Sequence, residues 1–101
     1  YFLLAAGERS HWHKVDATET WLFHTGAPLI LSLSATDAGP ATDELLTPDL
    51  QAGRPQIIVP ANHWQAAATT GDYTLVSCTV SPGFQFDGFT LAPSGFDIPR
   101  R

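Results

Sequence analysis

Hydrophobic and polar side chains alternate with a period of two along several stretches of this chain. Leucine occupies every second position from Leu29 to Leu33, and residues 73–80 alternate in the same way. Successive side chains of a β-strand point to opposite faces, so this period predicts strands with one buried row. The chain has no convincing amphipathic helix pattern. We therefore expect an all-β protein.

Turn-forming residues divide the rest of the chain into further short strands. We expect strands at residues 1–6, 11–14, 18–24, 56–59 and 63–69, the first of them buried. Gly71-Asp72 is typical of a hairpin turn. Residues 37–53 predict a long loop with one helical turn at residues 43–46. We expect an aromatic tail, formed by Phe84, Phe86 and Phe89, to pack across the fold. Many short strands favour a sandwich or barrel.

Length and composition favour a single packed domain over residues 1–101. The chain is 44% hydrophobic and 15% charged, which is too apolar and too weakly charged for a disordered protein. Ten acidic and five scattered basic residues give a formal net charge of -5 at pH 7. Nucleic acids need clustered basic residues, and an anionic membrane repels such a chain, so we expect neither as a partner.

The single cysteine, Cys78, excludes an intrachain disulfide and favours a reducing, cytoplasmic compartment. Its apolar strand predicts an inert core thiol. The chain opens at Tyr1 and contains no methionine. We therefore expect that the N-terminus of a parent protein is missing from it.

Candidate chemistry gathers around His11 and His13, which alternation places on one face of a strand. Glu19 follows a turn and shares a face with Trp21. Two imidazoles and a carboxylate can converge inside a barrel, and such ligands suit Zn, Fe, Mn, Ni or Cu. The alternative is that these histidines are hydrogen-bonded interior or rim residues. The three tryptophans are expected in the core or at an interface, and His24 at the surface or an interface.

Two segments resemble the two sequence motifs of the cupin superfamily. The first motif corresponds to Gly7, His11, His13, Glu19 and Gly26, and the second to Gly53 and residues 60–65. An uncharacterised single-domain branch of cupins is the most similar. That similarity rests on the stretches His13-Lys14-Val15, Glu19-Thr20-Trp21, Phe23-His24-Thr25-Gly26, Val59 to Gln65 and Val80 to Phe84.

The resemblance implies a cupin-type double-stranded β-helix, which is an RmlC-like jelly-roll barrel, and a homodimer formed by sheet-to-sheet packing. It also implies additional N-terminal strands of a parent protein that this chain lacks. Cupins include sugar epimerases, isomerases, dioxygenases and binding proteins, so the fold alone does not select a function. Two departures matter. The interval from His13 to Glu19 is longer than in the usual motif, and the metal-binding histidine of the second motif corresponds to Gln65. Asn62 replaces a turn glycine, and asparagine tolerates left-handed backbone geometry.

The resemblance therefore implies two alternative sites. In one, His11, His13, Glu19 and Gln65 hold a divalent transition metal. In the other, His63 and Gln65 face inward and form a hydrogen-bonding wall, with His63 as the acid or base.

Three hypotheses of function follow. The first is small-molecule binding without a required metal, with epimerase-like or isomerase-like action on a sugar or nucleotide-sugar-like ligand. Its predicted pocket residues are His13, Glu19, Trp21, His63 and Gln65. The second is a metal-dependent isomerase or oxygenase. The third is a non-enzymatic dimeric binding module with a vestigial pocket.

Overall fold

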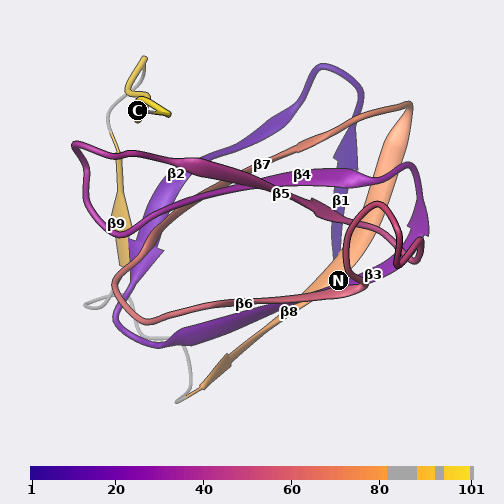
Figure 1. Ribbon diagram of the computed structural model, residues 1–101, viewed down its shortest axis with the longest axis horizontal. Coiled ribbons are helices and arrows are strands. Elements are labelled where there is room, and N and C mark those ends of the chain that lie inside the picture. The colour runs from indigo at the N-terminus through magenta and orange to yellow at the C-terminus, as the bar shows by residue number, and fades with distance from the viewer. Residues whose placement is uncertain (82–88, 93–94, 101) are drawn as a thin grey trace.

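The chain folds into strands that form two antiparallel sheets (Figure 1). The computed structural model describes residues 1–81, 89–92 and 95–100. Within these ranges there are nine strands and no helix, which confirms the all-β prediction. The strands are β1 (Phe2–Ala5), β2 (Arg9–Val15), β3 (Thr18–Gly26), β4 (Leu29–Ser34), β5 (Thr42–Leu46), β6 (Gln56–Val59), β7 (Trp64–Thr69), β8 (Tyr73–Ser81) and β9 (Phe89–Leu91). Accordingly, no described helix is long and apolar enough to cross a lipid bilayer.

The main core lies between the two sheets. One sheet has the strand order β1-β8-β3-β6, and the other has the order β5-β4-β7-β2-β9. The leucine row of β4 points into this core as predicted, since Leu29 and Leu31 are fully buried and Leu33 is 8% exposed. The opposite sheet contributes Leu4, Trp21, Ile57, Val59 and Val76 to the same cluster. This arrangement is the one expected for a jelly roll, in which inner faces of two sheets share a core.

A second apolar cluster covers the outer face of the larger sheet. Its buried members are Trp12, Ala41, Trp64, Ala66, Ala92 and Ile98. The C-terminal segment closes this cluster, because Ile98 is fully buried and Arg100 makes ion pairs with Asp43 and Asp97. Trp12 Nε1 donates a hydrogen bond to Asp97 at 2.8 Å. The three tryptophans are therefore core residues, as predicted.

Two predicted elements are wrong because distant strands, rather than neighbours in sequence, supply the pairing partners. Gly71-Asp72 is not a hairpin turn, since β7 pairs with β2 and β4 whereas β8 pairs with β1 and β3. The link between β7 and β8 thus passes from one sheet to the other. Residues 43–46 form no helical turn but belong to β5, which pairs with β4 and buries Leu46 completely.

The first strand is also less buried than predicted. Because β1 lies at the edge of its sheet, Leu4 is buried whereas Phe2 is 39% and Leu3 57% exposed. The predicted aromatic tail falls on Phe84 and Phe86, which lie outside the described residues, and on Phe89, whose side chain is also outside them.

A bulge in β2 sets the direction of the side chains around the site. Ser10 pairs with Ala67 and His13 with Gln65, so three steps along β2 match two steps along β7. One extra residue therefore sits in β2 between these pairs, and the alternation of faces is interrupted there. Just before β7 begins, Asn62 adopts a φ of 67° in the turn after β6, which is the left-handed geometry expected of it.

Candidate functional site

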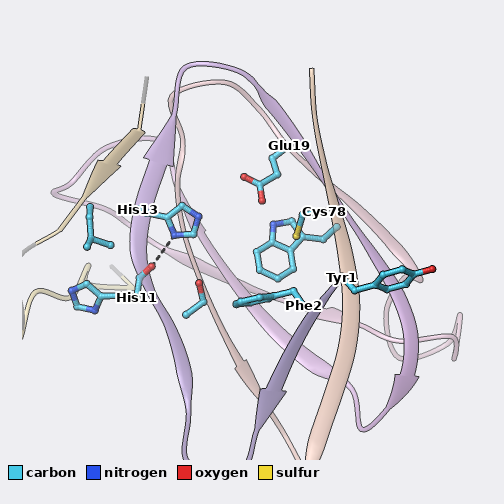
Figure 2. A pocket seen from close by; sticks show the side chains of 9 residues that line it. Tyr1, Phe2, His11, His13, Glu19 and Cys78 are labelled. Atoms are coloured by element: carbon cyan, nitrogen blue, oxygen red, sulfur yellow. Dashed lines mark hydrogen bonds between the residues drawn. The ribbon is translucent and has the colours of Figure 1, made fainter. Parts of the chain in front are cut away.

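A cavity of about 380 Å³ is lined by residues from both sheets (Figure 2). Strands β1, β3 and β8 of the smaller sheet and β2 and β9 of the larger sheet contribute to it. Its lining residues are Tyr1, Phe2, Ser10, His11, His13, Glu19, Trp21, Cys78 and Leu91. The side chains of His13 and Glu19 point toward one another in this view. The cavity thus has a polar end beside an aromatic wall.

Glu19 is held by a buried amide that is itself fixed. Trp21 Nε1 donates to Gln65 Oε1 at 2.7 Å, and Gln65 Nε2 donates to Glu19 Oε1 at 3.0 Å. An indole N–H can only donate, so it requires the amide oxygen of Gln65 to face it and leaves the amide NH₂ for the carboxylate. Gln65 is fully buried and Glu19 is 7% exposed. A chain of two buried hydrogen bonds, from Trp21 to Gln65 and from Gln65 to Glu19, therefore fixes the position of this carboxylate.

His13 has a defined pattern of proton positions. Its Nδ1 lies 2.8 Å from the backbone carbonyl oxygen of His11, as the dashed line in Figure 2 shows. A carbonyl oxygen only accepts, so Nδ1 carries the proton and donates. In the neutral ring, Nε2 is then the nitrogen that can accept a proton. This tautomer suits His13 to act as a general base.

Cys78 lines the same cavity next to Glu19. Burial first, then the negative charge of Glu19 and a hydrogen bond to Glu19, together raise the pKa of the Cys78 thiol to about 12. The thiol is therefore neutral and protonated at physiological pH. Cys78 is partly buried rather than enclosed in the core, and it contributes a weak hydrogen-bond donor to the cavity wall.

The aromatic wall consists of Phe2 and Trp21, whose rings meet edge to face with centroids 6.1 Å apart at an angle of 76°. Trp21 is 1% exposed, so neighbouring side chains hold it firmly. Tyr1 is 93% exposed, and its ring lies 5.1 Å from that of His24. His24 is an exposed surface residue, as predicted, and its Nε2 lies 2.9 Å from Ser77 Oγ.

Comparison with known protein families identifies the chain. Residues 1–92 match the family described as "Cupin superfamily (DUF985)". The chain belongs to the cupin superfamily. A search among curated proteins finds no match.

Two solved structures share the fold of this cupin. A protein from Shewanella oneidensis is 43% identical, with a TM-score of 0.82, over 90% of this chain and 58% of its own. A hypothetical protein from Leishmania major is 25% identical, with a TM-score of 0.81, over 94% of this chain and 64% of its own. The chain therefore spans less than two thirds of the length of either protein.

The structure brings together part of the pocket predicted from the sequence. His13, Glu19 and Trp21 line the cavity, and Gln65 lies directly behind the last two. Gln65 is not among the residues that line the cavity. Its amide hydrogen-bonds to both Trp21 and Glu19, so it holds these two side chains in position. His63 lies outside the cavity in the turn before β7, where its Nδ1 is 3.4 Å from the carbonyl oxygen of Ala61.

The expectation that His11 and His13 share a face is wrong. Figure 2 shows the imidazoles of His11 and His13 on opposite sides of β2, which follows from the bulge between Ser10 and His13. His11 also lines a second cavity, of about 400 Å³, beside Trp12 and Phe96. Local alternation could not reveal this separation, because the bulge arises from pairing with β7.

Several lining residues were not singled out from the sequence. Ser10 reaches the cavity through the bulge, and Tyr1, Phe2 and Leu91 reach it through strands at the edges of the two sheets. For Cys78, the alternation in β8 does indicate its direction, because it places Cys78 on the same face as the buried Thr74 and Val76. That signal predicts an inward side chain but not a cavity beside it.

The predicted metal ligands do not fit a resident ion. His11 lies across β2 from His13, and the amide oxygen of Gln65, the atom that would coordinate a metal, accepts a hydrogen bond from Trp21. Within residues 1–81, 89–92 and 95–100, no group of three or more His, Cys, Asp or Glu side chains is arranged to hold a metal. No step proposed below therefore uses one.

Proposed function

We propose that this cupin domain binds a small hydroxylated molecule of sugar-like size in the cavity beside His13 and Glu19. Ligand pockets of roughly 300–1,000 Å³ are typical of small-molecule sites, and a cavity of about 380 Å³ suits a single ring rather than a long chain. The proposal concerns the site on this chain, whatever further segments its relatives possess.

One observation carries the proposal: a fixed carboxylate and an oriented imidazole face the same cavity, next to an aromatic wall. Glu19 accepts hydrogen bonds from ligand hydroxyls, and the imidazole of His13, oriented by the carbonyl oxygen of His11, is a second polar group of the same wall. Phe2 and Trp21 supply the apolar surface against which the C–H face of a sugar ring packs. Polar groups that orient a ligand against an apolar wall are the usual composition of a specific small-molecule site.

The same geometry supports epimerase-like or isomerase-like proton transfer. In such a reaction, His13 takes the proton from the hydroxyl-bearing carbon next to a carbonyl, and the C–H electron pair moves onto the carbonyl oxygen to give an enediolate. Return of the proton to the opposite face of the same carbon gives an epimer, and return of the proton to the neighbouring carbon gives an isomer. The sequence suggested His63 for this acid or base role. We assign the role to His13 instead, because His63 is not among the residues that line the cavity.

Two measurements test the proposal. Calorimetric titration with a panel of aldoses and ketoses measures binding, and His13→Gln and Glu19→Gln should each weaken it at least tenfold. Deuterium exchange from D₂O into a bound keto-sugar, followed by NMR, measures proton transfer. His63→Gln is the matched control, since it removes an imidazole outside the cavity and should leave both readouts unchanged.

The outcomes separate the possible functions. Binding with exchange that His13→Gln abolishes supports the enzyme. Binding without exchange supports a binding domain and removes the catalytic step. If no sugar binds, or if His63→Gln weakens binding as much as His13→Gln does, the proposed site is wrong.

A further inference from the structure

Charge is distributed unevenly around the cavity. Among its lining residues, Glu19 is the acidic side chain, and the described lining includes neither lysine nor arginine. The four lysine and arginine residues within the described ranges lie elsewhere. Arg9 lines the second cavity, Lys14 lies 5.1 Å over the ring of Trp64, Arg54 follows β5, and Arg100 pairs with Asp43 and Asp97.

The negative charge of Glu19 acts in a shielded place. Its side chain is 7% exposed and is held by Gln65, so little water screens it and it cannot swing away to solvent. Charge–charge interactions strengthen several-fold when water is replaced by protein, because the effective dielectric constant falls. The adjacent rings of Phe2 and Trp21 add to the effect, since the face of an aromatic ring attracts a cation.

We infer that the cavity selects by charge: it takes a ligand with an ammonium group, or a neutral polyol, and rejects phosphorylated and carboxylated ligands. This inference rests on the proposed function and names the chemical class of its ligand. An ammonium group pairs with Glu19 beside the aromatic wall. A phosphate or carboxylate in the same place meets the buried carboxylate of Glu19 with no lysine or arginine in the described lining to offset it, which is costly. The amino terminus that acts on Cys78 belongs to Tyr1, which is 93% exposed, so water screens its charge. A nucleotide-sugar, with its diphosphate, is therefore disfavoured relative to an amino sugar.

A matched set of sugars tests this. Glucose, 6-amino-6-deoxyglucose and glucuronate share one ring and differ at carbon 6, which carries a hydroxyl, an ammonium or a carboxylate. Isothermal titration at pH 8.0 and low salt, where an ordinary imidazole is neutral, gives the three dissociation constants. We expect the amino sugar to bind at least tenfold more tightly than glucuronate, with glucose between them.

Two variants assign the effect to one carboxylate. Glu19→Gln keeps the size of the side chain and removes its charge, so the difference between amino sugar and glucuronate should shrink to less than threefold. Glu44→Gln removes the same charge from β5, outside the cavity, and should leave the difference intact. Circular dichroism and thermal unfolding confirm that each variant is folded.

The outcomes are distinguishable. Tighter binding of glucuronate than of the amino sugar overturns the inference and leaves the proposed function standing. An equal loss of selectivity in Glu44→Gln and Glu19→Gln also overturns it, because the effect then reflects net charge rather than the cavity. If none of the three sugars binds, the proposed function fails, and the inference fails with it.

Discussion

The single cysteine of the chain offers a measure of burial and charge inside the cavity. Burial and the nearby Glu19 raise the pKa of Cys78 from an ordinary value of 9.0 to about 12, so below pH 9 the native thiolate is about a thousandfold scarcer than in the unfolded chain. A thiolate of higher pKa is also more nucleophilic, by about 16- to 32-fold over three units. The two effects together predict that the native thiol reacts about 30- to 60-fold more slowly than the thiol of the unfolded chain. Restricted access of the reagent to the buried thiol slows the reaction further.

The rate of exchange with the neutral disulfide 4,4′-dithiodipyridine at pH 8.0 measures this ratio, with the urea-unfolded chain as the reference. Glu19→Gln removes the second and third causes of the raised pKa and leaves burial, so its native rate should rise several-fold yet stay below the unfolded rate. Glu44→Gln should match the unmodified chain. A native thiol that reacts as fast as the unfolded one would refute the burial of Cys78. An unchanged rate in Glu19→Gln would show that the charge of Glu19 does not act on the thiol.

Three further predictions concern stability. Ile98→Ala should cost about 2–5 kcal/mol in urea unfolding because the side chain is fully buried, whereas Leu50→Ala, at an exposed site, should cost less than about 0.5 kcal/mol; equal costs would mean that the C-terminal segment is not anchored. Hydrogen bonds from an indole and a backbone N–H hold the pKa of Asp97 below its usual 3.8. The ionised Asp97 therefore stabilises the folded state above about pH 3.8, and this stabilisation is lost as the pH falls through its lowered pKa. Asp97→Asn should therefore reduce the dependence of the free energy of unfolding on pH in this acidic range. Gly26→Ala should destabilise more than Gly7→Ala: both residues have positive φ, but the added Cβ at Gly26 meets a backbone oxygen at 2.5 Å and that at Gly7 meets open space.

Local rules were sufficient for the class of the fold and for most strand positions. A period of two depends on the geometry of one strand, so the leucine row of β4 and the strand over residues 56–59 could be predicted without knowledge of their partners. The sequence also places Glu19 and Trp21 on one face, and the two cupin-like motifs indicate which stretches lie near each other.

What the sequence alone could not supply depends on contacts between distant residues. Gln65 was expected to bind a ligand, but its amide hydrogen-bonds to Trp21, 44 residues away, and to Glu19, 46 residues away. The bulge that separates His11 from His13 exists only in the pairing of β2 with β7.

The sequence by itself therefore determined an all-β chain of the cupin family with a histidine and a glutamate in its first motif. The tertiary structure decided which side chains face the cavity, which of them are already hydrogen-bonded, and which sheet each strand joins. The physical reason is that the direction of a side chain follows from its own backbone, whereas its partners and its burial follow from strand pairing across the whole fold.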